Sequence, residues 1–202
     1  MAKQQRGADT VERVLDAALH CFTESGLYDA TIEELARRAQ VSVGSLYHHF
    51  ASRDRIAFVL YCRWMESLMG ACAAALVGRR SASAGVKALV RAYLQWVGQH
   101  RQAARFIFAA GATELADKWK DELGPFKQRL LAPIFAWFQP HIAAGAVAAM
   151  PFPLYEIVII GPAAEFSRRW LSGAPGLDLE EGTRVLPEAV WRAVAGRRQR
   201  AD

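Results

Sequence analysis

Apolar residues recur at three- and four-residue intervals along most of this chain, and this spacing constrains its fold more than any other feature of the sequence. The first segment shows the pattern most clearly, and its apolar face comprises Val11, Val14, Leu15, Ala18, Leu19 and Phe22. Such spacing predicts amphipathic helices that each bury one face. The strand-like run 157–160 is too short to be distinguished from a buried helical turn, and its helical flanks favour helix. We therefore predict an all-α fold.

Capping residues, glycines and prolines indicate where the helices begin and end. Thr31 and Glu34 have the spacing of a capping box, and Ser42 is suited to cap the helix that follows. The expected helices cover residues 10–25, 31–39, 42–49, 52–77, 86–100, 103–110, 115–139, 154–171 and 180–195. Interruptions are expected at Gly124-Pro125 and at Gly161-Pro162, because proline cannot complete the helical hydrogen-bond pattern. Residues 79–85, rich in small side chains, are predicted to be a linker.

The composition indicates a folded protein from a reducing compartment. Apolar residues make up 52% of the 202 residues, which excludes a disordered chain and supplies a core of useful size. Three cysteines without paired spacing argue against a secreted disulfide framework. The polar, basic start of the chain is unlike a secretory signal, and no run reaches the roughly 20 apolar residues of a membrane helix. We expect a soluble, cytoplasmic protein with no membrane partner.

The formal net charge of +5 suggests a nucleic-acid binder, but the charge lies in the wrong part of the chain for that simple interpretation. Residues 1–60 contain seven cations and eight anions, whereas residues 61–202 contain eighteen cations and twelve anions. Any prediction of DNA binding near the N-terminus therefore depends on where individual cations are placed.

One motif carries a specific function. Residues 31–50 read TIEELARRAQVSVGSLYHHF, which predicts two short helices separated by a tight turn. In a helix-turn-helix unit the second helix enters the major groove of DNA while the first braces it. Ala36 is small where the helices would approach closely, and Val41 and Leu46 are apolar and suited to hold the pair together. The second helix would expose side chains able to meet phosphates or base edges.

Together with its flanks, the motif resembles the DNA-binding domain of TetR-family transcriptional regulators. The resemblance covers about residues 10–60 and includes FTESG at 22–26, TIEELA at 31–36, VSVGSLYHHF at 41–50 and Ser52-Arg53. It implies a three-helix DNA-binding domain over residues 1–52 and a larger helical domain for ligand binding and dimerisation over residues 53–202. The DNA-binding residues that it implies are Thr31, Ser42, Val43, Gly44, Ser45, Tyr47, His48 and Arg53, with Lys3 and Arg6 as a flexible basic arm.

The chain departs from the family pattern at two positions. Gln40 stands in the turn, where glycine is common, and a non-glycine residue in a left-handed conformation costs roughly 1 kcal/mol. Val43 stands where a basic residue is common, and it could contact a thymine methyl group instead of a phosphate.

Catalytic and metal-binding patterns do not stand out in the sequence. It contains no His-Glu-x-x-His, no Gly-rich phosphate loop and no Cys-x-x-Cys. The adjacent His48 and His49 would point in different directions from one helix, so they could not share a metal ion. We therefore predict that the protein is not an enzyme and has no metal site or cofactor.

The remainder of the chain suggests a ligand-responsive body. All six tryptophans lie beyond residue 60, and aromatic residues line helical ligand pockets as well as cores. The candidate ligand-binding residues are Trp96, His100, Arg105, Phe106, Thr113, Trp137, Tyr155 and Glu165. The resemblance implies a repressor that binds a palindromic double-stranded DNA operator as a homodimer through its last two helices, and that a small apolar effector releases. Two alternatives stay open: a C-terminal domain that only dimerises or binds a protein, and a helical enzyme.

Overall fold

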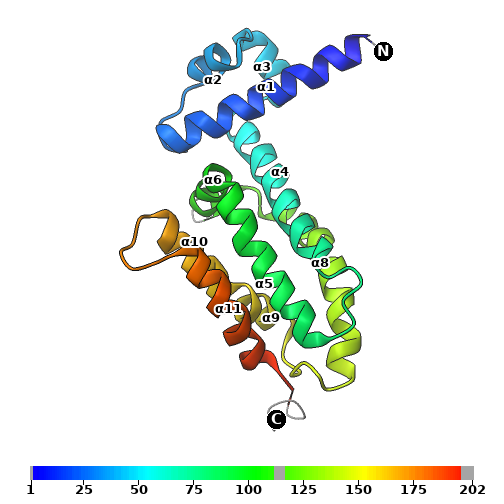
Figure 1. Cartoon of the computed structure of the whole chain (residues 1–202). Coiled ribbons are helices and arrows are strands. Elements are labelled where there is room, and N and C mark those ends of the chain that lie inside the picture. Colours follow the sequence, from blue (N-terminus) through cyan, green and yellow to red (C-terminus); the bar gives the residue numbers. More distant parts are fainter. Residues whose placement is uncertain (1, 112–116, 197–202) are drawn as a thin grey trace. The chain divides into compact units, whose positions relative to one another are not determined.

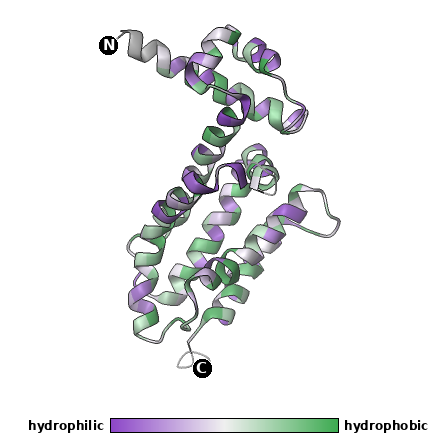
Figure 2. Ribbon diagram, turned by 180° about the vertical axis from the view of Figure 1, so that it is seen from behind, coloured by the Kyte–Doolittle hydropathy of each residue, from purple (hydrophilic) through white to green (hydrophobic). Residues whose placement is uncertain are grey.

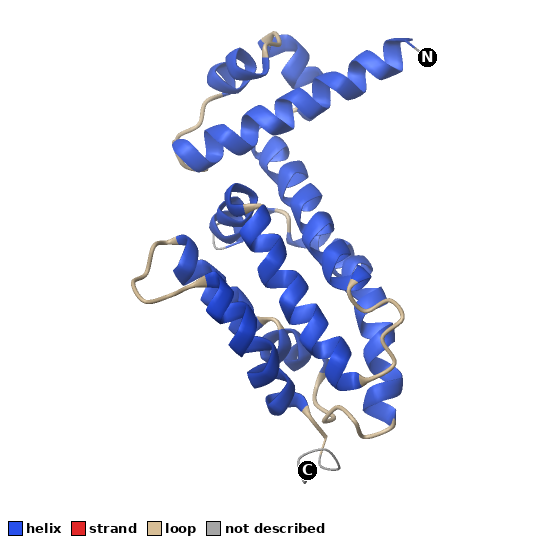
Figure 3. Ribbon diagram, viewed as in Figure 1, coloured by secondary structure: helices blue, strands red, loops and turns tan. Residues whose placement is uncertain are grey.

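The computed structural model describes residues 2–111 and 117–196, with the backbone alone for residues 2–6. Within these ranges the chain consists of helices and loops (Figure 3). Val147 and Ala195 form an isolated antiparallel β-bridge. The prediction of an all-α fold is confirmed. Colouring by hydropathy (Figure 2) shows polar and apolar stretches alternating along the helices, as expected when each helix buries one face.

Contacts between residues divide the chain into two compact units. The first unit comprises Met1–Met65 with Gln102–Leu123, and the second comprises Glu66–Arg101 with Gly124–Asp202. We call them the head and the body. The functional division after residue 52 that the sequence suggested stays a proposal, because the contacts include the first turns of the fourth helix in the head.

Four helices form the first part of the chain (Figure 1): α1 (Ala2–Glu24), α2 (Ile32–Ala39), α3 (Val43–Phe50) and α4 (Arg53–Ala74). Helix α1 packs on α2, and α2 packs on α3. The core of the head includes Val14, Ala18, Leu35, Leu46 and Ile56, each fully buried or nearly so. The apolar face predicted for α1 is therefore the face that the head buries, although α1 begins at Ala2, eight residues before the predicted start.

The remaining helices are α5 (Ala82–Gln99), α6 (Arg101–Gly111), α8 (Lys120–Ala143), α9 (Phe152–Ile159), α10 (Gly161–Leu171) and α11 (Leu179–Val194). In the body, α11 packs along α5, and α10 contacts both (Figure 1). The predicted break at Gly161-Pro162 is confirmed, because α9 ends at Ile159 and α10 begins at Gly161.

Two predictions of irregular structure are wrong. Ser81 caps α5 by accepting a hydrogen bond from the backbone N–H of Ala84, so the second half of the predicted linker is helical. Its small side chains allow another helix to approach closely. Helix α8 continues through Gly124-Pro125. Its three prolines, Pro125, Pro133 and Pro140, all lie on the exposed face of the helix, where water can satisfy the carbonyl groups that they leave without partners.

Helix α4 needs separate mention because of its composition. It is long enough to cross a membrane, and its most apolar 18-residue window has a mean hydropathy of 1.2. Core helices of water-soluble proteins meet the same criterion, and 44% of that window is buried within the protein. Two of its arginines, Arg55 and Arg63, form ion pairs with Glu122 and Glu12 of the head.

Candidate functional site

The helix-turn-helix unit is built from the caps that the sequence predicted. The Thr31 hydroxyl accepts a hydrogen bond from the backbone N–H of Glu34 at 3.2 Å, and Ser42 accepts one from Ser45 at 3.1 Å. Each cap satisfies a backbone donor that the start of a helix leaves without a partner. Between the helices, Gln40 takes the left-handed conformation, with φ 55° and ψ 46°. The guanidinium of Arg13 donates a 3.4 Å hydrogen bond to the Gln40 carbonyl, so α1 supports this turn.

The interior of the unit is apolar and tightly packed. Leu35 and Leu46 are fully buried, and Ala36 and Ala39 are each 3% exposed. Ala36 therefore occupies the close approach that its size predicted. Because α2 and α3 contribute to one core with α1, the orientation of α3 is determined by packing rather than by a flexible loop.

The outer edge of α3 is left free for a ligand. Ser42, Val43, Gly44, Tyr47 and His48 are all exposed, and Tyr47 retains half of its free surface. A Cβ atom built at Gly44 would meet only the Ser42 hydroxyl, at 4.0 Å, so the packing of the protein itself does not require glycine there. The absence of a side chain at Gly44 would instead allow the helix to approach a DNA groove closely.

Other predicted DNA-binding residues have different surroundings. Thr31 is exposed at the start of α2, whereas Ser45 is half-buried, with its N–H bonded in the cap. The ring of His49, the neighbour of His48, is partly packed beside α1, and a Cβ atom at Gly7 would lie 3.8 Å from it. His48 and His49 thus point in different directions, as predicted, with His48 exposed and His49 partly packed.

Lys3 and Arg6 were expected in a flexible basic arm. Their backbone lies in α1, so they extend the first helix instead of forming a separate segment. Their contact with DNA stays a prediction.

Arg53 is committed to the head itself. Its guanidinium donates hydrogen bonds to the carbonyl oxygens of Tyr28, at 2.5 Å, and Ala30, at 3.5 Å. It also pairs with Asp54 at 3.2 Å. These bonds hold the loop between α1 and α2 against the start of α4. If Arg53 also contacts a phosphate, as predicted, the same side chain has both a structural role and a DNA-binding role.

Neighbouring charges extend the same cluster to residues 117–123. Lys118 hydrogen-bonds to Asp54, and this contact, followed by the weaker one from Arg53, lowers the pKa of the Asp54 carboxyl. The Arg55 guanidinium lies 4.8 Å from the ring centre of Phe58 and 4.9 Å from that of Trp119. The start of α4 is thus attached to a distant part of the sequence.

The body contains a second candidate site, a small apolar cavity of about 60 Å³ that opens to solvent. Helices α4, α5, α8 and α9 form its wall. The lining residues are Met69, Leu89, Leu131, Ile134, Phe135, Phe138, Phe152, Pro153, Tyr155, Glu156, Ile159 and Ile160. Mostly apolar walls with few polar groups are typical of small-molecule sites.

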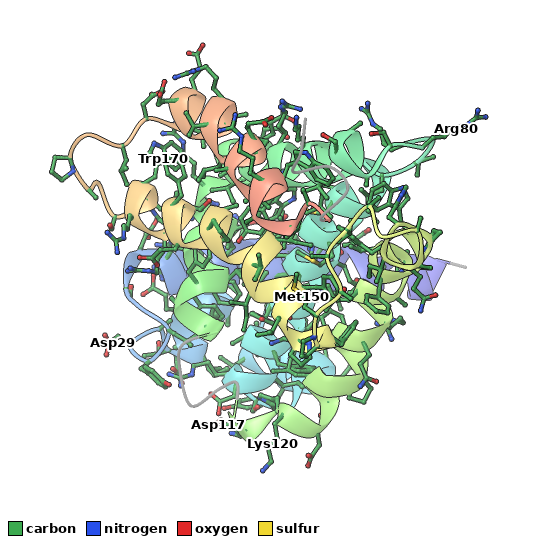
Figure 4. All side chains as sticks on the ribbon, turned by 90° about the horizontal axis from the view of Figure 1, so that it is seen from below. Asp29, Arg80, Asp117, Lys120, Met150 and Trp170 are labelled. Atoms are coloured by element: carbon green, nitrogen blue, oxygen red, sulfur yellow. The ribbon has the colours of Figure 1, made fainter. Side chains whose placement is uncertain are left out.

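Of the predicted ligand-binding residues, Tyr155 lines this cavity. Its hydroxyl accepts a hydrogen bond from the Met150 N–H and donates one to the Ala148 carbonyl, both at 3.1 Å. The ring therefore faces the cavity with its polar end already occupied. Met150, labelled in Figure 4, lies in the loop that leads into α9.

The other predicted ligand-binding residues lie elsewhere. Trp96 is buried and donates to the Ser67 hydroxyl at 3.0 Å, and His100 lies against its ring. Trp137 packs on α5. Glu165 is exposed, and its hydrogen bonds with Arg168 and Arg169 lower its pKa to about 2.

Two further candidates, Arg105 and Phe106, belong to the head rather than to the body. Phe106 stacks on Phe22 with ring centres 5.7 Å apart, and Arg105 is exposed on the same helix. Thr113 lies outside the described residues. Of the described candidates that belong to the body, Tyr155 alone lines the cavity.

Most of the cavity wall was not predicted from the sequence. Leu131, Ile134, Phe135 and Phe138 have the spacing of one helical face, which was recognisable as a pattern. The residues that face them come from α9, and periodicity cannot show which helices are neighbours. Among the described residues, no three His, Cys, Asp or Glu side chains lie close enough together to hold a metal ion.

Comparison with known proteins identifies the head. Residues 14–59 match the family described as "Bacterial regulatory proteins, tetR family". The A-factor receptor protein of Streptomyces griseus is 47% identical over 57 residues, which are 28% of this chain and 21% of that protein. The HTH-type transcriptional regulator SrpR of Pseudomonas putida is 45% identical over 42 residues, 21% of this chain and 20% of that protein. The similarity to these curated relatives thus spans about a fifth of their length.

Similarity in fold extends over nearly the whole chain. A TetR family transcription regulator from Marinobacter aquaeolei has a TM-score of 0.82 at 17% identity, with 96% of this chain and all of that one covered. FadR from Bacillus subtilis, solved in complex with stearoyl-CoA, has a TM-score of 0.74 at 16% identity over 89% of this chain and 96% of that one. At such low identity, the similarity of the body is one of fold alone.

Proposed function

We propose that this chain is a transcriptional repressor of the tetR family that binds palindromic operator DNA as a homodimer and is released by a small apolar effector; the match of residues 14–59 to that family supports this assignment. The proteins that it resembles are transcription regulators rather than enzymes, so the helical-enzyme alternative has no support from them.

The observation that carries the DNA-binding role is the exposed edge of α3 on a well-packed head. Ser42, Tyr47 and His48 offer hydrogen-bonding groups, and Val43 offers a methyl-bearing surface. Polar side chains of this kind position a protein on phosphates, and apolar ones contact thymine methyl groups. A dimer would place two such helices in successive major grooves, about 34–36 Å apart.

The effector role is supported by the cavity in the body. Its aromatic and aliphatic wall suits an apolar molecule, and FadR, which has a similar fold, was solved with a bound stearoyl-CoA. Binding of effector and of operator would then oppose each other by the same factor, as linkage requires.

One surface favours the alternative in which the body binds a protein. Phe152, Leu154 and Ile157 of α9 are 51%, 41% and 62% exposed. Large apolar side chains gathered on one helix are typical of a contact surface. Such a contact could accompany an effector site or replace it.

The test begins by selecting bound duplexes from a random pool with the purified protein. We expect a palindrome with half-sites one helical turn apart, bound with strong dependence on salt concentration. Tyr47→Ala should weaken binding to that duplex roughly tenfold, the usual effect of losing a hydrogen bond to a charged group. Tyr28→Ala is the matched control, because Tyr28 is equally exposed on the head but lies outside the helix-turn-helix unit. Failure to recover any duplex with salt-sensitive binding would contradict the proposal.

A further inference from the structure

The wall of the body cavity has an unusual distribution of charge. Of its twelve lining residues, ten are aliphatic or aromatic hydrocarbon side chains or methionine, and the other two are Tyr155 and Glu156. No lysine, arginine or histidine is among them. An acidic ligand would therefore find no counter-charge in this wall, and burying an uncompensated charge is costly.

Glu156 is the one formally charged group at the cavity. It is exposed, and its carboxylate has no ion pair or hydrogen bond with the described residues. The contrast with Glu165 and Glu188 of the same body is clear, since each of these carboxylates is paired with two cations. The negative charge at the cavity is therefore available to a ligand.

Aromatic rings belong to the same cavity wall as this carboxylate. Phe152 precedes Glu156 by four residues on α9, so both lie on the same face of the helix. Phe135 packs edge-on against Phe152 with ring centres 4.4 Å apart, and Tyr155 lies 6.2 Å from Phe135. The faces of such rings attract cations as well as apolar groups.

The apolar surface also continues beyond the cavity. A more open hollow lies beside it and shares Phe135, Phe152 and Tyr155 with it. The rest of its wall comprises Gln139, Ile142, Ala143, Ala149 and Met150, again without a cation. Met150 is labelled in Figure 4. The two hollows together offer an apolar surface longer than either one.

We propose that the body binds an amphiphilic organic cation, an amine or quaternary ammonium with an extended apolar part. The apolar part lies along the cavity between α8 and α9 and the adjoining hollow, and the positive charge lies beside the carboxylate of Glu156 and the neighbouring rings. The proposal specifies the chemical class of the effector, and to that extent it rests on the proposed function.

The test compares three probes of equal chain length by isothermal titration calorimetry: decyltrimethylammonium, decanol and decanoate, each below its micelle concentration. We expect the cation to bind about tenfold more tightly than the alcohol, the order of an ion pair combined with cation–π contacts, and decanoate to bind most weakly. Glu156→Gln should remove the preference for the cation and leave the affinity for decanol unchanged. Glu180→Gln is the matched control, because Glu180 is exposed on α11 and is absent from both hollows.

The location of the site is tested by Leu131→Trp, which fills the cavity from α8 and should abolish binding of the cation while the thermal unfolding transition is retained. Equal affinity for all three probes, a preference that survives Glu156→Gln, or no binding of the cation would each overturn the proposal. Binding that depends on Glu156 but does not release DNA would leave the site in place and contradict the effector role. Release of DNA by decanol or decanoate alone would support an effector but refute the cation.

Discussion

At the scale of single residues, Arg53 shows how one side chain acquires a second role. The family resemblance assigns it to a phosphate, yet its guanidinium donates to the carbonyls of Tyr28 and Ala30 and holds the loop that precedes α2. Its side chain is 27% exposed, so part of it still faces solvent. The residue therefore supports the head that presents α3, whether or not it contacts DNA.

Replacing Arg53 tests this structural role. Arg53→Gln should lower the free energy of unfolding by about 1–2 kcal/mol, because its charged hydrogen bonds to the carbonyls of Tyr28 and Ala30 are lost. Arg37→Gln is the control, since Arg37 is 71% exposed and pairs only with Glu34 of its own helix. Urea denaturation measures the change in stability. If the variant keeps its stability, and the slope of its DNA affinity against salt concentration falls by the amount expected for one phosphate contact, Arg53 serves DNA binding alone.

At the scale of elements, close contact between α5 and α8 depends on one glycine. The ring of Trp137 lies over Gly85, and its indole N–H donates to the Arg79 carbonyl at 2.9 Å. A Cβ atom at Gly85 would be 2.1 Å from the ring, closer than atoms can approach. The last residue of the predicted linker is therefore glycine because a tryptophan of another helix packs on it.

A pair of glycine substitutions tests this contact. Gly85→Ala should destabilise the protein by about 1–3 kcal/mol through overpacking. Gly70→Ala should have the opposite sign, a gain of up to about 1 kcal/mol, because a Cβ atom at that exposed helical position meets nothing within 4 Å. Thermal unfolding of the two variants gives the comparison. A loss of stability of the same size in both would mean that Trp137 moves aside without cost.

At the scale of the whole molecule, the proposed dimer requires that the outer faces of α10 and α11 form a contact surface between subunits. On α11, Val185 is 43% exposed and lies among ion pairs between Arg184 and Glu181 and between Arg192 and Glu188. An apolar centre with a charged rim is typical of an interface between subunits. The exposed apolar side chains of α9 offer a competing surface.

Matched substitutions distinguish the two surfaces. Val185→Arg should shift the protein from dimer to monomer in sedimentation velocity, because two arginines would face each other across a twofold axis. The predicted helix 154–171 is divided into α9 and α10, and we place the interface on α10 and α11; Ile157→Arg on α9 should therefore leave the dimer intact. The reverse result would move the interface to α9.

Much of the head was predictable because its determinants are local. Thr31 and Ser42 cap their helices through residues three positions away, and Gln40 adopts the left-handed turn that its place between two helices implies. Helix propensity and capping act within about one turn, so a short stretch of sequence is enough to predict where these helices begin and end. The same locality explains the confirmed break before Gly161.

By itself, the sequence determined that the chain is all-helical, that residues 31–50 form a helix-turn-helix unit, and which side chains lie on its outer edge. Tertiary structure alone decided that Arg53 holds a loop, that Phe106 belongs to the core of the head, and that Tyr155 and Glu156 face a cavity. The reason is physical. Periodicity specifies which face of a helix is buried, but packing between helices far apart in the sequence decides what that face meets.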